Sequence, residues 1–192
     1  VRSDTMKNRT LFSRDEMLEM NIRTLKERTV EVEEIAEIAY RQQKKWTDDI
    51  SLTDCVDSVE KILSIRDVFH IVQLGAEIDR LAEEKAFKGP ILDVLLQDLG
   101  MFGIDELFGL ELAGMYGTIG KTNFGDIDVN KPLAVARLNG DGKEGHEMCH
   151  TFLDDIVGAI AAAASTRVAQ MTNEIEAQKD PHVKSIKLNL DL

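Results

Sequence analysis

Apolar residues recur at steps of three and four along most of this chain, which is the spacing that places them on one face of an α-helix. The first strong run is Val32, Ile35, Ala36, Ala39 and Tyr40. It predicts an amphipathic helix that ends near Trp46. Ser13 and Glu16 are three residues apart and can form a capping box at the start of the helical region.

The same spacing predicts further helices in the middle of the chain. Ser51 or Thr53 can cap one of them, and residues 68–82 repeat the pattern. Gly89-Pro90 begins a fourth helix, because proline is favoured at the first helical position. A fifth helix is predicted from Ile104 to Tyr116.

The second half of the chain contains breaks and one long apolar segment. Glycine and asparagine are frequent in residues 117–131, which predicts a loop, and Lys131-Pro132 can restart a helix after it. The segment from Cys149 to about Met171 reads as one helix whose centre, Gly158 to Ala164, is small on every face. Because small side chains let neighbours approach from all sides, we expect this to be the central helix of a bundle.

Composition supports this all-α interpretation. Aromatic residues make up only 5% of the chain and prolines number three, which suits aliphatic helix packing better than a sandwich or barrel. A chain of 192 residues is long enough for one domain. We expect a loose N-terminal arm over residues 1–12, one helical domain over 13–172 and a polar tail over 173–192. Within the tail, residues 186–190 alternate in polarity and fit a short edge strand or disorder.

The negative net charge of the chain limits which molecules it can bind. Asp plus Glu number 35 against 23 Lys plus Arg, and a surface with this net charge of −12 repels the phosphates of nucleic acids. It also repels anionic lipids, so a lipid substrate would have to be met through a local apolar or cationic patch. Divalent cations, by contrast, are attracted to such a surface.

Location and assembly follow from the apolar segments and the cysteines. The apolar run from Ile156 to Thr166 falls short of the roughly 20 residues that a bilayer requires. Cys55 and Cys149 form no CxxC pair, which favours reduced thiols. These features predict a cytoplasmic protein, in peripheral contact with the inner face of the cell membrane if its substrate is a lipid. Apolar stripes in the first 86 residues also predict homo-oligomers.

Carboxylates are grouped at three places, namely Asp105-Glu106, Asp126 with Asp128, and Asp154-Asp155. Mg²⁺ takes oxygen ligands and is usually held by one or two carboxylates plus waters and phosphate oxygens. Acidic side chains on facing helices of a bundle would meet that need. Asp154 and Asp155 border an apolar run, so at least one is expected to point inward. The alternative is a solvated edge or an ion pair with Arg137, Lys143 or Arg167.

Three short motifs resemble those of the phosphatidylglycerophosphatase A family, in the same order. They are residues 103–109 (Gly-Ile-Asp-Glu-Leu-Phe-Gly), 128–132 (Asp-Val-Asn-Lys-Pro) and 152–158 (Phe-Leu-Asp-Asp-Ile-Val-Gly). The chain as a whole is similar to the soluble branch of that family, the YutG-like and low-temperature-requirement C proteins. Gly125 is found where the middle motif of the family carries an arginine.

The resemblance implies a Mg²⁺-dependent phosphatase of phospholipid biosynthesis, which converts phosphatidylglycerophosphate to phosphatidylglycerol and folds as a bundle around one central helix. Five carboxylates would then hold the metal or orient its water: Asp105, Glu106, Asp128, Asp154 and Asp155. Lys131 would meet the substrate phosphate. A metal held by carboxylates lowers the pKa of bound water and neutralises developing charge, so no covalent nucleophile is required.

Two weaker signals concern a lysine and two histidines. Gly120-Lys121-Thr122 is similar to the end of a P-loop but lacks the glycine that this motif requires five residues earlier, which argues against nucleotide binding. Lys121 can still contact a phosphate. His146, His150 and Asp154 are spaced by four residues, so on a continuous helix they would lie on one face and could bind zinc or iron. Otherwise the histidines are surface residues, and His150, which is close in sequence to Asp154, can act in proton transfer.

Two other functions fit the same residues. A regulatory or interaction protein could keep the fold without the activity, and an all-α, Mg²⁺-dependent pyrophosphatase could hydrolyse nucleotides. Phosphate release from different esters, measured with and without Mg²⁺, distinguishes the three functions.

Overall fold

The computed structural model describes residues 12–98, 103–140 and 148–179. This part of the chain contains nine helices and no strand, so the all-α prediction is confirmed. The helices are α1 (Arg14–Glu27), α2 (Val32–Lys44), α3 (Leu52–Leu63), α4 (Arg66–Glu83), α5 (Pro90–Leu96), α6 (Glu106–Gly114), α7 (Gly117–Asn130), α8 (Ala134–Gly140) and α9 (Leu153–Lys179).

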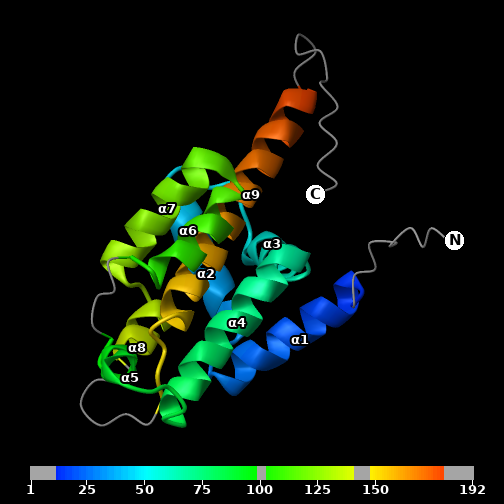
Figure 1. Cartoon of the computed structure of the whole chain (residues 1–192). Coiled ribbons are helices and arrows are strands. Elements are labelled where there is room, and N and C mark those ends of the chain that lie inside the picture. The colour runs from blue at the N-terminus through cyan, green and yellow to red at the C-terminus, as the bar shows by residue number, and fades with distance from the viewer. Residues whose placement is uncertain (1–11, 99–102, 141–147, 180–192) are drawn as a thin grey trace, which may run out of the picture.

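Helix α9 passes through the middle of the bundle, and its C-terminal end projects beyond the other helices (Figure 1). Every residue from 151 to 166 is buried. Helices α2, α3, α4, α6, α7 and α8 all pack against α9, whereas α1 and α5 lie further out and pack against α4. The predicted central helix is therefore confirmed, and the alanines at 161–164 explain how neighbours can surround it.

The helix predicted to end near Trp46 is in fact two helices, α1 and α2. Thr29 takes a left-handed backbone conformation, with φ 64°, which ends α1. The N–H of Val30 then donates to the carbonyl of Leu25 at 2.9 Å, and Val30 is buried in the core. The chain thus reverses in a tight turn before α2 begins.

The prediction of a loop over residues 117–131 is wrong, since α7 occupies nearly all of it. Packing outweighs the low helix propensity of its glycines. Phe124 and Ile127 are buried. Gly120 lies so close to α6 that a Cβ there would be 2.1 Å from the carbonyl oxygen of Ala113.

The long C-terminal helix begins and ends later in the sequence than predicted. It begins at Leu153, because residues 151 and 152 form a turn, and it continues to Lys179, into the segment expected to be a polar tail. Residues 174–179 are rich in glutamate, alanine, glutamine and lysine, which favour a helix without any apolar face to bury. The strand or disorder expected at 186–190 lies outside the described residues.

Other local signals are confirmed. The capping box of Ser13 and Glu16 begins α1, Pro90 is the first residue of α5, and α6 lies within the fifth predicted helix. Cys55 and Cys149 are buried and form no disulfide.

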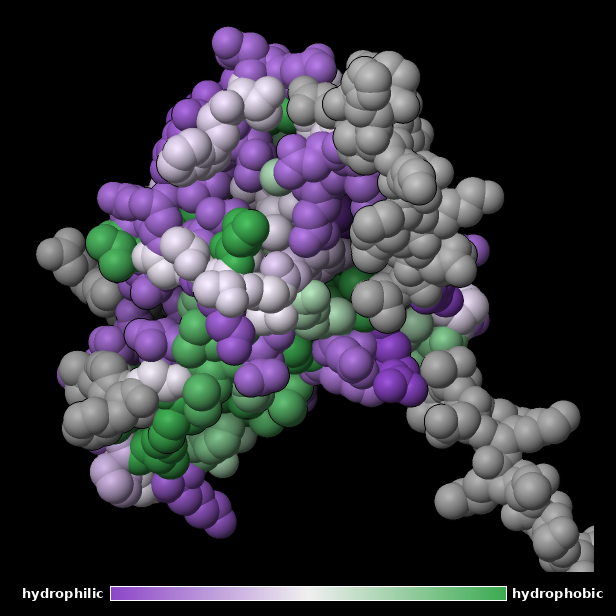
Figure 2. All heavy atoms as spheres, turned by 90° about the horizontal axis from the view of Figure 1, so that it is seen from above, coloured by the Kyte–Doolittle hydropathy of each residue, from purple (hydrophilic) through white to green (hydrophobic). Residues whose placement is uncertain are grey.

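The surface seen from above in Figure 2 is largely polar, with one area where apolar side chains gather. Large apolar side chains are also exposed next to the acidic motifs, at Ile104, Leu107 and Val129. Over the residues that the structure covers, no helix combines the length and the apolar character needed to cross a bilayer.

Candidate active site

Lys131 lies among the acidic residues. Its ammonium nitrogen Nζ is 2.7 Å from Oδ1 of Asp128, 3.2 Å from Oδ2 of Asp154 and 3.6 Å from Oδ1 of Asp155. Asp128 is in the last turn of α7, Lys131 follows that helix, and the other two residues are in the first turn of α9. Two of the three carboxylate groups seen in the sequence therefore meet around one cation.

The third group lies at the start of α6. Asp105 is the N-cap of this helix, accepts a hydrogen bond from the N–H of Glu106 at 3.1 Å, and is only 7% exposed. Gly109, one turn later, allows α6 to approach α9, since a Cβ there would be 3.2 Å from the carbonyl oxygen of Asp155. We call the following set the acidic cluster: Asp105, Glu106, Asp128, Asp154 and Asp155, with Lys131 among them.

Burial and mutual repulsion raise the pKa of several carboxyls in the acidic cluster. For Asp155, burial is the main cause and the charge of Asp154 adds to it, whereas for Asp154 the charge of Lys131 opposes the effect of burial. Burial also raises the pKa of Asp105 and Glu106. Burial works against the ammonium of Lys131, but the surrounding carboxylates raise its pKa and keep it charged. One ammonium does not balance five carboxylates, so the cluster has excess negative potential.

The chemistry of this donor set fits a hard divalent cation. Carboxylate oxygens are the ligands that Mg²⁺ prefers, and a buried excess of negative charge is stabilised by a cation. In the described parts of the chain, no three acidic, cysteine or histidine side chains are already arranged to hold a metal ion. The ammonium of Lys131 lies within 3.6 Å of an oxygen from each of Asp128, Asp154 and Asp155, so it occupies the place that a bound cation would take.

Asp154 and Asp155 both point inward, as expected for at least one of them. Their exposed fractions are 3% and 5%. Arg137 and Arg167, the alternative partners, contact other residues instead. Lys143 lies outside the described residues.

Other residues singled out in the sequence lie away from the acidic cluster. Asp126 pairs with Lys45 at 2.8 Å on the outside of α7. Lys121 is exposed, its side chain lies against Gly114, and it is about 10 Å along α7 from Asp128. Its contact with a phosphate stays a prediction.

His150 is buried beside Arg28, with Nδ1 3.3 Å from Nη2 of the guanidinium. It precedes α9, and its carbonyl accepts a hydrogen bond from the N–H of Asp154 at 3.0 Å. His146 lies outside the described residues. A role of His150 in proton transfer stays a prediction.

Sequence patterns did not indicate that Asn139 and Asp98 belong to this site. The amide Nδ2 of Asn139 is 3.2 Å from Oδ2 of Asp154 and 3.3 Å from Oδ2 of Asp98. Asp98 has no adjacent acidic residue, and Asn139 belongs to a short helix next to a glycine-rich segment. The packing of α8 on α9 brings Asn139 to Asp154, and Asp98 reaches Asn139 from the end of α5.

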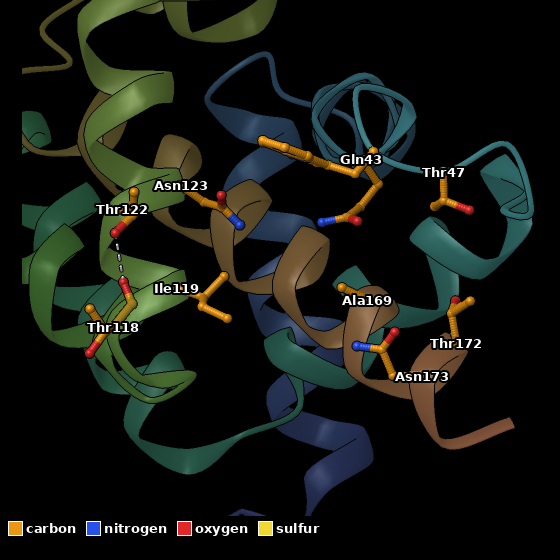
Figure 3. A pocket seen from close by; sticks show the side chains of 10 residues that line it. Gln43, Thr47, Thr118, Ile119, Thr122, Asn123, Ala169, Thr172 and Asn173 are labelled. Carbon is orange, nitrogen blue, oxygen red and sulfur yellow. Dashed lines mark hydrogen bonds between the residues drawn. The ribbon is translucent and has the colours of Figure 1, made fainter. Parts of the chain in front are cut away.

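A cavity of about 590 Å³ lies elsewhere, between the end of α2, the first half of α7 and the second half of α9 (Figure 3). Its wall includes Trp46, Ile119 and Asn123, and none of its lining residues is charged. Ala169, also in the wall, follows Asp155 by fourteen residues, which is about 21 Å along a helix. Without charged side chains, this cavity is unsuited to phosphate chemistry.

Comparison with known proteins matches the chain to a family. A sequence model of the phosphatidylglycerophosphatase A family matches residues 46–170, which include the whole acidic cluster. The uncharacterized protein YutG of Bacillus subtilis is 43% identical over 152 residues, which cover 79% of this chain and 90% of YutG. The crystal structure of YpjQ from Bacillus subtilis has a TM-score of 0.78 at 36% identity and covers 85% of this chain and 99% of its own. For the low temperature requirement C protein of Listeria monocytogenes the TM-score is 0.77 at 38% identity, with 82% and 97% covered. The chain therefore belongs to the phosphatidylglycerophosphatase A family.

Proposed function

We propose that this protein is a Mg²⁺-dependent phosphatase that removes the phosphate of phosphatidylglycerophosphate. Membership of the family supports phosphatase chemistry. The observation that carries the proposal is the acidic cluster, in which three carboxylates are buried (Asp105, Asp154 and Asp155) and Nζ of Lys131 lies within 3.6 Å of three carboxylates. It combines an excess of negative charge, which favours a metal, with a cation that can bind a phosphate oxygen.

The residues that would hold Mg²⁺ or orient its water are the five carboxylates of the acidic cluster, with Asp155 on the water. Bound there, the metal supplies a water of lowered pKa and neutralises charge on the phosphate oxygens. Lys131 donates to a phosphate oxygen in place of one of its carboxylate partners, in a charge-assisted hydrogen bond.

Asp155 is the carboxyl best suited to move a proton. Burial and the charge of Asp154 raise its pKa towards the neutral range, in which a general base works best. It takes a proton from the attacking water as the water oxygen bonds to phosphorus and the ester P–O bond breaks. The same proton then passes to the leaving alkoxide, which departs as the alcohol.

Exposed apolar side chains flank the acidic motifs and suit a phosphate that is attached to a lipid. Ile104 and Leu107 flank the Asp105-Glu106 pair in the sequence and are 55% and 52% exposed, and Val129 follows Asp128 and is 80% exposed. These side chains can contact the apolar part of a lipid while its phosphate reaches Lys131. The protein then works at the membrane surface by peripheral contact.

The test is phosphate release by the purified protein from vesicles that contain phosphatidylglycerophosphate, with Mg²⁺ and with EDTA. We expect release with Mg²⁺ only. Asp105→Asn should lose this activity, whereas Asp126→Asn, which removes a carboxylate of α7 outside the acidic cluster, should keep it.

The alternative functions give different results in the same assay. Hydrolysis of nucleoside triphosphates without hydrolysis of the lipid would identify a nucleotide pyrophosphatase. A lack of release from any phosphate ester would indicate a regulatory or interaction protein that has kept the fold.

A further inference from the structure

The first turn of α9 is capped by a side chain from another helix. Asp79 of α4 is fully buried, and its carboxylate accepts hydrogen bonds from the N–H groups of Phe152 at 3.1 Å and Leu153 at 3.0 Å. Phe152 has no acceptor in its side chain, and the hydroxyl of Thr151 donates to the carbonyl of Leu95. Asp79 therefore satisfies N–H groups that a helix N-terminus leaves without an acceptor.

A second carboxylate of α4 holds the residues just before this turn. Glu83 accepts a hydrogen bond from the N–H of Cys149 at 2.6 Å and forms an ion pair with Arg28, also at 2.6 Å. Arg28 in turn donates to the carbonyl of Cys149. Both backbone polar groups of Cys149 are thus fixed by charged side chains, which form stronger hydrogen bonds than neutral ones.

Gly75 brings α4 close to the same part of α9. A Cβ at Gly75 would be 2.2 Å from Cδ1 of Ile156. Gly75, Asp79 and Glu83 are spaced by four residues and so lie on one face of α4. This face of α4 contacts the chain along residues 149–156, the segment that carries both aspartates of α9 in the acidic cluster.

We propose that Asp79 is a positioning residue of the acidic cluster: by fixing the first turn of α9, it sets where Asp154 and Asp155 lie relative to Lys131. The inference rests on the proposed function, because it takes the acidic cluster as the metal site. Leu153, which Asp79 binds, directly precedes Asp154, so a small rotation of this turn moves both carboxylates. Replacing a residue that orients a metal ligand typically weakens metal binding by about 10- to 100-fold.

The experiment compares Asp79→Asn with Val59→Ala. Asparagine keeps the shape of Asp79 but removes its charge and one of the two oxygens that accept from the N–H groups of Phe152 and Leu153. Val59 is fully buried in α3, and its truncation lowers stability by leaving a cavity. Two quantities are measured for each variant: the Mg²⁺ concentration that gives half of the rise in melting temperature, and the kcat and KM for the lipid substrate.

We expect Asp79→Asn to raise the half-effect Mg²⁺ concentration on the order of tenfold and to lower kcat, with KM for the lipid unchanged. Val59→Ala should lower the melting temperature and leave the half-effect concentration as in the native protein. A merely structural role of Asp79 would give both variants the same behaviour, so a native half-effect concentration in Asp79→Asn would overturn the proposal.

The two measurements separate this inference from the proposed function. A native protein that responds to Mg²⁺ but releases phosphate from no ester would overturn the phosphatase, while the Mg²⁺ response would still decide the role of Asp79. A native protein whose melting does not respond to Mg²⁺ would overturn both. If Asp79→Asn does not fold, Glu83→Gln weakens the second contact of α4 with this segment, at the N–H of Cys149 and at Arg28, and an unchanged half-effect concentration in that variant would overturn positioning by α4.

Discussion

Asp154 and Asp155 are adjacent in the sequence but differ in their partners. Asp154 lies 3.2 Å from both the ammonium of Lys131 and the amide of Asn139. Asp155 has Lys131 at 3.6 Å and the charge of Asp154 beside it. Because hydrogen bonds and opposite charges favour the ionised form, Asp154 is the more stable anion of the two, which is why we propose Asp155 as the carboxyl that exchanges a proton.

Replacing Asp155 or Asp105 by asparagine should remove the response of the protein to Mg²⁺. A ligand that binds only the folded state adds about 2.7 kcal/mol to its stability at a hundredfold excess over Kd, so the native protein should melt higher with Mg²⁺. Asparagine keeps the shape and removes the charge. Each variant should therefore lose the shift, stay folded and, in EDTA, melt no lower than the native protein, as calorimetry in both buffers will show.

Asp126→Asn is the matched control for these variants, because Asp126 is also acidic but pairs with Lys45 outside the acidic cluster. It should keep the Mg²⁺ shift. If the shift persists in the Asp155 and Asp105 variants as well, the metal site lies elsewhere. A large loss of stability in EDTA would instead indicate that these carboxylates serve a structural ion pair.

Without metal, the protein should become less stable as the pH rises. Burial raises the pKa of Asp79 to about 8, and burial together with the charge of Asp154 raises the pKa of Asp155. Such a carboxyl binds its proton more tightly in the folded state than in the unfolded state. Its stabilising effect is complete below about pH 4, the ordinary value for aspartate, and is lost as the pH rises through the folded pKa.

Melting temperatures in EDTA should accordingly fall between about pH 5 and pH 8, a range that lies above the ordinary aspartate pKa. The fall should be smaller in Asp155→Asn, which has one group fewer to titrate. A melting temperature that rises over this range would show that the aspartates have lowered pKa values in the folded protein.

At the level of single residues, the sequence identified acidic side chains but not their contacts. The apolar run beside Asp154 and Asp155 indicated an inward direction because an unpaired carboxylate is costly to bury, and both are buried. The contact between Lys131 and Asp154 joins residues 23 positions apart and depends on how α7 and α9 pack. The burial of Asp79 could not be predicted, because an acidic residue in an amphipathic helix usually faces water.

At the level of elements, α6 and α7 approach each other through a glycine, and its replacement should be costly. Alanine normally favours a helix over glycine by up to about 1 kcal/mol. At Gly120, however, the new Cβ would lie 2.1 Å from the backbone carbonyl oxygen of Ala113, which cannot move without displacing α6. Gly120→Ala should therefore destabilise the protein by about 1–3 kcal/mol, the usual range for overpacking.

Gly125 provides the matched control on the same helix. No neighbouring atom lies within 4 Å of the position where its Cβ would be. Gly125→Ala should be neutral or slightly stabilising in the same chemical denaturation experiment. Equal stability of the two variants would contradict the close approach of α6 and α7.

Helices were predicted well where apolar residues recur regularly, as in α3 and α4, because the pattern records which face is buried. Helix α7 was missed because its glycines, which are poor helix formers, are required for close packing that only the tertiary structure shows. The break between α1 and α2 was missed for the opposite reason. The left-handed turn there uses Thr29, and no glycine marks it in the sequence.

For the molecule as a whole, the small residues in the middle of α9 were the decisive signal. A helix that is small and apolar on every face has to be surrounded, and six helices pack around it. The meeting of the three acidic motifs could not be predicted in the same way, since it depends on how α6 and α7 pack against α9. Homo-oligomers and contact with a membrane stay predictions.

Trp46, at the wall of the uncharged cavity, is the one tryptophan of the chain and is 79% exposed. The wavelength of indole emission follows the polarity around the ring, and this ring is already in water when the protein is folded. Unfolding in urea should therefore leave the emission wavelength almost unchanged while the helical circular dichroism signal disappears. A marked red shift on unfolding would instead show that something covers Trp46 in the native protein, such as a second copy of the chain. The intrinsic fluorescence of this protein thus reports what binds at that end of the bundle and carries little information about whether the bundle is folded.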